Sequence, residues 1–182
     1  MRALLVYSLI SLLAACASKT YPISSPYYFI PTGSRIELHQ TLTIPPNSAS
    51  LYMQYGKVVT PKERDQYHAN CWFLSWKMLE TPQTIKPDTF IVTRSVKSQD
   101  YVLGSQTVKL ASNGRNTRIG AVAGDSSPII EYVTELYIHS DKQPDIRRLA
   151  CSHWDDPIDD LHLTVEQIQN TLGKIATIEI NK

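Results

Sequence analysis

The chain lacks the charge imbalance that is typical of nucleic-acid-binding proteins. Its 182 residues contain 18 Lys and Arg against 17 Asp and Glu, and no basic tract interrupts this balance. Because nucleic acid backbones are bound mainly by clustered Lys and Arg, this composition argues against nucleic acid as the main partner. It also offers no polybasic route to a membrane surface.

Local enzyme signatures are missing as well. The sequence has no Gly-x-Ser-x-Gly, Ser-x-x-Lys, His-Glu-x-x-His, Cys-x-x-Cys or phosphate-loop motif. Catalytic groups can still be brought together by a fold. A cleft that combines His139, Glu135 and either Asp155 or Asp156 would support a hydrolase. We expect no cofactor, no metal and no identifiable catalytic residue from the sequence alone.

Long hydrophobic runs are limited to one stretch near the start. Residues 3–13 are mostly apolar, follow Arg2 and precede Ala14-Ala15, the three-part pattern of a secretory signal. The run is shorter than the roughly 18 residues expected of a membrane-spanning helix. We therefore interpret residues 1–15 as a signal peptide.

The residues at the expected cleavage point, Leu13-Ala14-Ala15-Cys16, resemble the lipobox of bacterial lipoproteins. The resemblance implies that Cys16 becomes the first mature residue and is lipidated, which would attach the chain to a membrane. In Gram-negative lipoproteins an Asp after the lipidated Cys favours the inner membrane. Ala17 stands there, so the resemblance implies the inner leaflet of the outer membrane, facing the periplasm. Beyond this signal the chain is similar only in general style to small envelope lipoproteins.

Only two cysteines remain in the mature chain, Cys71 and Cys151. An even pair in an exported protein predicts a disulfide, here closing a loop of about 80 residues. The alternatives are free thiols or a zinc site that uses His68 and His153 as further ligands. Zinc ligands usually come in tightly spaced pairs, a pattern that these residues do not follow.

The mature chain divides into a tether and one domain. Residues 16–33 show no hydrophobic period and contain three prolines, as an extended tether would. Within them, Tyr27–Ile30 are apolar enough to cover an edge of the domain or to dock a partner. Residues 34–182 show no repeat and no further boundary, so we predict a single β-rich domain.

Alternating apolar and polar residues dominate this domain. They predict a mainly β fold of seven to nine mostly antiparallel strands, arranged as a sandwich or a partly closed barrel. One short helix is expected near the C-terminus, because Thr164 and Gln167 match a capping box and Gly173 fits the helix end. Residues 111–128, with Arg115 and Arg118, and the acidic residues 155–160 are expected to be loops.

The stretch Tyr67–Leu79 is the richest strand candidate. Trp72, Leu74, Trp76 and Met78 share one face and Cys71, Phe73 and Ser75 the other. We interpret the tryptophan face as a buried core stripe, with an exposed ligand platform as the alternative.

These features favour a non-catalytic, lipid-anchored envelope protein that acts as a binding or structural module facing the periplasm. Its expected partners are the membrane, through the lipid, and an envelope protein. Two alternatives stay open: a hydrolase acting on an envelope polymer, and a carrier with an apolar cavity for a lipid or small molecule.

Overall fold

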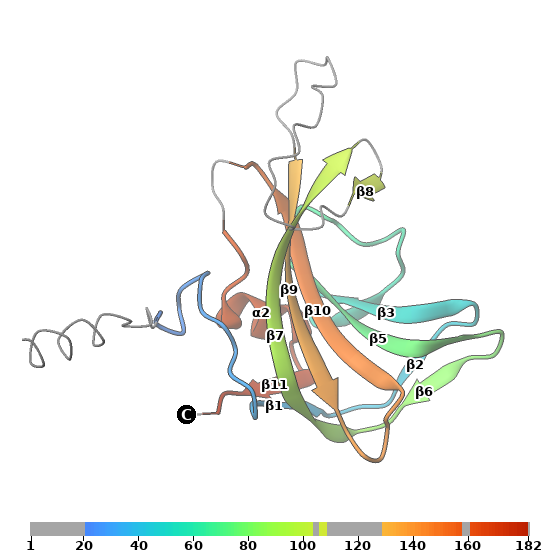
Figure 1. The fold of residues 1–182 in the computed structure, drawn as a ribbon. Coiled ribbons are helices and arrows are strands. Elements are labelled where there is room, and N and C mark those ends of the chain that lie inside the picture. Colours follow the sequence, from blue (N-terminus) through green and yellow to red (C-terminus); the bar gives the residue numbers. More distant parts are fainter. Residues whose placement is uncertain (1–20, 104–105, 109–128, 158–160, 182) are drawn as a thin grey trace, which may run out of the picture.

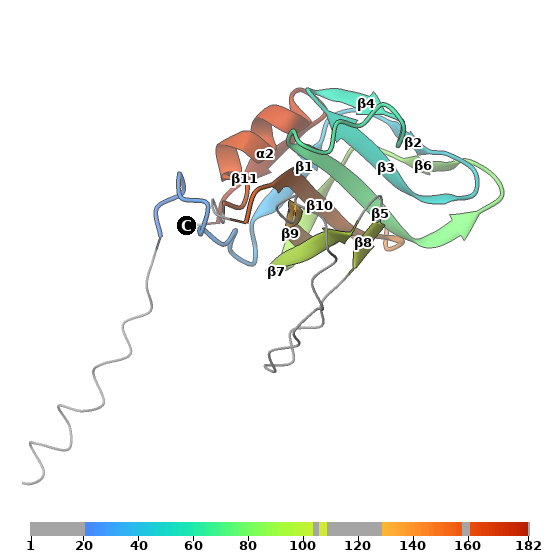
Figure 2. The ribbon, with the colours of Figure 1, turned by 90° about the horizontal axis from the view of Figure 1, so that it is seen from above.

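The computed structural model describes residues 21–103, 106–108, 129–157 and 161–181 (Figures 1 and 2). Their eleven strands are β1 (Arg35–Leu38), β2 (Leu42–Ile44), β3 (Ser48–Gln54), β4 (Lys57–Val59), β5 (Asn70–Leu79), β6 (Gln83–Ile85), β7 (Asp88–Leu103), β8 (Gln106–Val108), β9 (Ile129–His139), β10 (Ile146–Asp155) and β11 (Ala176–Glu179). Helix α2 (Val165–Leu172) precedes β11. The predicted mainly β fold is confirmed.

Eight strands form one antiparallel sheet in the order β11-β1-β7-β9-β10-β5-β3-β4, and β8 pairs with the end of β7. This sheet curls into a half-barrel (Figure 1). Register shifts interrupt β7 between Val92 and Arg94, β10 between Ile146 and Arg148, and β3 between Ser48 and Ser50. Bulges of this kind increase strand twist and bend, which explains how the long strands follow the curve.

One hydrophobic core fills the concave side of the sheet. Ile36, Phe73, Phe90, Leu136 and Leu149 are all buried in it. Helix α2 contacts β11 at one edge of the sheet and β3 and β5 near the other, so it lies across the opening of the half-barrel. Its apolar side, including Ile168 and Leu172, joins the same core. An eight-residue helix is not stable alone in water, so α2 depends for its stability on this packing against the core.

Helix α2 begins and ends as the sequence predicts. Thr164 and Gln167 form both hydrogen bonds of a capping box. At the other end, Gly173 has a positive φ of 57° and meets Gly56 of the β3–β4 turn. A Cβ on Gly173 would lie 2.7 Å from the Cα of Gly56, so only glycine fits this contact. The helix end is thereby tied to the turn.

The strands differ from prediction in number. The expected count of seven to nine was too low, because the short strands β2, β4, β6 and β8 give little signal in the sequence. The alternating residues 34–44 are divided between two sheets, since β2 pairs only with β6. Strand β7 runs without a turn through Gln99 and Asp100.

Residues before the domain also pack on it. Ile30 belongs to the core, Tyr28 packs against it, and the amide of Gly33 donates to the carbonyl of Val92 at 2.8 Å. Lys97 donates to the carbonyl of Pro26. Thus the apolar part of the expected tether covers an edge of the domain, whereas the side chains of Tyr27 and Phe29 stay largely exposed.

Cys71 and Cys151 face each other directly across β5 and β10 and form a disulfide, with their Cα atoms 4.0 Å apart. The zinc alternative is therefore wrong for these two sulfurs, because each is bonded to the other. In the described residues, no helix has the length and apolar character needed to cross a membrane.

Candidate functional site

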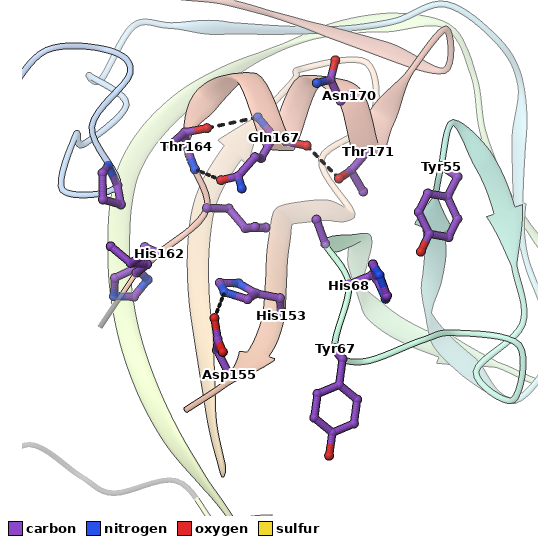
Figure 3. Close-up of a pocket in the computed structure, with 14 residues that line it drawn as sticks. Tyr55, Tyr67, His68, His153, Asp155, His162, Thr164, Gln167, Asn170 and Thr171 are labelled. Atoms are coloured by element: carbon purple, nitrogen blue, oxygen red, sulfur yellow. Dashed lines mark hydrogen bonds and ion pairs between the residues drawn. The ribbon is translucent and has the colours of Figure 1, made fainter. Parts of the chain in front are cut away.

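A pocket of about 580 Å³ lies beside the start of α2 (Figure 3). Its walls come from the end of β10, the β3–β4 turn, the segment before β5, and the residues leading into α2. The lining residues are Pro26, Tyr55, Tyr67, His68, Ala69, His153, Asp155, Leu161, His162, Leu163, Thr164, Gln167, Asn170 and Thr171. Ten of these fourteen carry a polar group, set among aromatic rings and aliphatic stems.

Two histidines of this pocket are fixed by one buried tyrosine. Tyr132 lies opposite His153 across β9 and β10, and their rings stack at 5.8 Å with an angle of 27°. The His162 ring meets the same tyrosine edge-on, at 5.5 Å and 83°. Tyr132 is only 1% exposed. Its rigid ring therefore holds both imidazoles in defined orientations.

Burial keeps both imidazoles neutral near pH 7. It lowers the pKa of His162 to about 4, and the positive charge of Lys97 acts in the same direction, as does that of His153 once it is protonated. Burial also lowers the pKa of His153, although Asp155 opposes this, with 3.7 Å between His153 Nε2 and the Asp155 carboxylate. The Lys97 ammonium is itself affected, since burial lowers its pKa to about 8.

Each of these histidines has one ring nitrogen without a protein partner. The Nδ1 atoms of His153 and His162 are buried and make no hydrogen bond in the described part of the chain. His162 as a whole is only 7% exposed. A buried polar atom left unpaired costs roughly 1–3 kcal/mol. Both nitrogens are enclosed by the protein, so a ligand in the pocket meets other atoms of these two rings.

The wall opposite His162 contains a residue with a strained backbone conformation, Tyr55. Tyr55 and Gly56 form the two-residue turn of the β3–β4 hairpin, with φ of 54° and 70°. Both angles are positive, as in a type I′ turn, whose first position strongly prefers Asn, Asp or Gly. The Tyr55 side chain is 64% exposed, so core packing does not explain a tyrosine there. Strained residues of this kind concentrate at functional sites.

The remaining wall is built by the segment before β5. Asp65 accepts hydrogen bonds from the backbone amide of Tyr67 at 3.0 Å and from Nδ1 of His68 at 2.9 Å. The Tyr67 ring packs edge-on against Trp154 at 5.6 Å. Figure 3 shows His162 on one side of the pocket and Tyr55 with His68 on the other, with His153 between them in this view.

Some residues singled out in the sequence meet in this pocket and others do not. His68, His153 and Asp155 line it together. His139 instead pairs with Asp141 at 2.9 Å, and Glu135 pairs with Arg148 on the face opposite the core. The cleft that would have supported a hydrolase is therefore not formed by His139, Glu135 and Asp155. No three His, Cys, Asp or Glu of the described ranges are grouped to hold a metal.

The interpretation of the tryptophan stripe was wrong. The core uses the other face of β5, where Cys71 and Phe73 are fully buried. Trp72 is half-buried, and Trp76 and Met78 are 66% and 69% exposed. Cys16, the expected lipidation site, lies outside the described residues, as do the loop with Arg115 and Arg118 and Asp159 and Asp160 of the acidic cluster.

Sequence reasoning missed Tyr55, Tyr67 and His162. Only Tyr55 left a readable signal, because a Tyr-Gly pair between two alternating segments marks a hairpin turn with an unusual first residue. No family model, no curated protein and no solved structure matches the chain significantly. The functional argument therefore depends on the geometry of the site.

Proposed function

We propose that the chain is a lipid-anchored envelope protein, held by Cys16, whose domain binds a neutral, hydroxyl-rich ligand of the saccharide class in the pocket. The observation that supports this most directly is that the neutral imidazoles of His153 and His162 and the exposed rings of Tyr55 and Tyr67 line one pocket. A neutral imidazole has one donor and one acceptor nitrogen. A hydroxyl group can meet either requirement.

The charges around the pocket favour a neutral ligand. Among the lining residues only Asp155 carries a charge near pH 7, and its carboxylate would repel an anion. The nearby Lys97 ammonium already donates to the carbonyl of Pro26. The rings of Tyr55 and Tyr67 are 64% and 57% exposed, which leaves them free to contact the C–H faces of a sugar ring. Asn170 adds an exposed amide. The volume falls within the usual range for small-molecule sites.

The two alternatives have less support. A lipid carrier needs an enclosed hydrophobic cavity, whereas this pocket is open to solvent and includes the carboxylate of Asp155 and two imidazoles beside its apolar surface. For a hydrolase, the threonine hydroxyls at the pocket are already used: Thr164 accepts from the Gln167 amide, and Thr171 donates to the Gln167 carbonyl. Binding without catalysis is therefore the function that the geometry supports best.

The test is binding of a saccharide panel to the mature chain, produced from residue 16 with Cys16→Ala. Glucose, N-acetylglucosamine and a disaccharide of the latter are suitable probes, followed by histidine ring signals in NMR and by calorimetry. We expect His162→Phe, which keeps the contact with Tyr132, to weaken binding at least tenfold. That loss corresponds to about 1.4 kcal/mol, a typical value for one hydrogen bond left unmade.

Tyr55→Asn provides the second variant, because it suits the type I′ turn and should not destabilise the fold. Matched controls are His139→Phe and Tyr21→Asn, which remove the same side chains outside the pocket. Binding that survives both pocket variants, or a complete absence of binding by the panel, would refute the saccharide proposal.

A further inference from the structure

The face of the sheet opposite the core has its own organisation. Leu74, Arg148, Tyr137 and Arg94 lie directly opposite one another across β5, β10, β9 and β7. The neighbouring row across the same strands, extended to β3, contains Tyr52, Trp72, Ala150, Glu135 and Val96. Cross-strand neighbours are close enough for their side chains to touch.

Arginines cover the aromatic rings of this face. The guanidinium carbon of Arg94 lies 3.9 Å from the centre of the Tyr137 ring, and that of Arg147 lies 4.2 Å from the Trp76 ring. Arg64 lies 4.7 Å from the Tyr52 ring and 6.0 Å from the Trp72 ring, and Arg148 lies 5.7 Å from the Tyr137 ring. We call these residues the arginine–aromatic belt: Tyr52, Arg64, Trp72, Trp76, Arg94, Tyr137, Arg147 and Arg148.

The belt is positively charged. It contains four arginines, and Glu135 is the one carboxylate in its two rows, which leaves a net charge of 4 − 1 = +3. Glu135 is already used, since it pairs with Arg148 and accepts from the Tyr137 hydroxyl at 3.4 Å. The other carboxylates on the described part of this face lie away from the belt, at Asp100 and Glu131 toward one end and at Glu37 and Glu179 on the edge strands β1 and β11.

Fold stability does not account for the composition of the belt. Trp76 is 66% exposed, Met78 beside it is 69% exposed, and Arg94 is exposed. Trp, Tyr, Met and Arg are the residue types enriched at the centres of protein interfaces, and Trp, Tyr and Arg dominate their hot spots. Stacking also orders the guanidinium groups in advance, and the guanidinium geometry matches that of a carboxylate.

A membrane is a poorer match for this surface. Interfacial membrane binding inserts apolar side chains below the headgroups while basic groups stay above them. Here the guanidinium groups lie over the rings, so inserting the rings would drag charge toward the hydrocarbon. We propose that the arginine–aromatic belt docks the acidic surface of a protein partner. This inference goes beyond the pocket, which lies on the other face of the same sheet.

The experiment places the photoreactive amino acid p-benzoylphenylalanine at position 78 of the full-length chain in its native cells. Position 58, on the edge strand β4, serves as the control because Val58 is also exposed, at 49%. We expect an adduct with one protein from position 78 and none from position 58, with cross-linked peptides rich in Asp and Glu. The identified partner is then purified and titrated with the unmodified chain.

Arginine variants test the chemistry of the contact. Arg94→Gln combined with Arg147→Gln should weaken binding of the purified partner about tenfold or more, and added salt should weaken binding of the wild type. Arg35→Gln is the matched control. It removes an exposed arginine of β1 that pairs with Glu179 of β11, and it should leave binding of the partner unchanged. No adduct at position 78, adducts with phospholipid only, or a partner whose affinity ignores the double variant would each overturn the proposal.

Discussion

The buried His162 should make the folded protein sensitive to mild acid. In the folded state its pKa is about 4, whereas an unperturbed histidine titrates near 6.5. Between these values the unfolded chain binds a proton that the folded chain does not. Stability therefore rises with pH through this window and is lost as the pH falls below about 6.5.

The size of the effect follows from the same two values. At pH 5 the solution is about 1.5 units below the unfolded pKa and still above the folded one. Each unit corresponds to about 1.36 kcal/mol, so His162 alone should remove about 2 kcal/mol of stability between pH 7 and pH 5. For a chain of this length, that loss lowers the unfolding midpoint by roughly 4–8 °C.

The assay is urea unfolding at several pH values from 5 to 7.5, with the disulfide intact. His162→Phe should flatten the pH dependence by about 2 kcal/mol, whatever its effect on absolute stability. His139→Phe, which removes an exposed histidine, should keep the wild-type slope. The pKa of His153 is also lowered by burial, so some slope remains in the variant.

The buried carboxyl of Asp88 does not obscure this window. Burial raises the pKa of Asp88, but hydrogen bonds from Gln143 and Ser140 outweigh this effect and hold the pKa below its usual value of 3.8. The contribution of Asp88 to folding stability is therefore lost only at pH values below about 3.8. Equal slopes for wild type and His162→Phe would show that the imidazole is not held neutral by burial, and the argument for a neutral pocket histidine would fail with it.

Two further predictions concern the cysteines. Replacing both Cys71 and Cys151 by Ala should lower stability by up to about 4.5 kcal/mol, because the disulfide closes a loop of 80 residues. The midpoint of thermal unfolding should fall by up to roughly 9–18 °C, and a midpoint within about 2 °C of wild type would contradict this account. Radioactive palmitate should label the wild-type chain in cells but not Cys16→Ala, and equal labelling of both would refute the lipid anchor.

The elements that the sequence predicted well are those with local or pairwise signals. The capping residues Thr164 and Gln167 act within one helical turn, so the helix could be placed accurately. The cysteine pair predicted the contact between β5 and β10, because two exported cysteines have one intramolecular pairing. Alternation of apolar and polar residues identified the long strands, because this signal lies within the sequence of each strand.

The face of β5 could not be chosen from its own residues. Both faces are apolar, and the tryptophan side chains have the larger apolar surface area. The hydrophobic effect alone would therefore favour burying the tryptophan face. In the folded chain, Arg64 and Arg147 from neighbouring segments cover these rings, while Phe73 packs against Phe90 in the core at 6.1 Å. Alternation along one strand gives no information about which arginines will lie beside it.

The pocket was out of reach for a related reason. Its histidines come from three separate segments, and His162 becomes a functional candidate only because Tyr132 and the surrounding core remove it from water. Burial of a polar side chain is a tertiary property. The type I′ turn at Tyr55 is the exception, since a tyrosine that precedes glycine between two alternating segments is recognisable from the sequence alone as a strained turn residue.

The two proposed sites share one rigid strand. β10 presents His153 to the pocket and Arg148 to the belt on the opposite face, and its hydrogen bonds to β9 and β5 are reinforced by the disulfide between β5 and β10. Coupling between sites requires an element with two arrangements whose equilibrium both ligands shift. The disulfide and the unbroken pairing of β10 from Arg148 onward favour a single arrangement of this part of the strand. We therefore infer that the pocket and the belt act independently, so that the protein can hold its ligand and its partner at the same time.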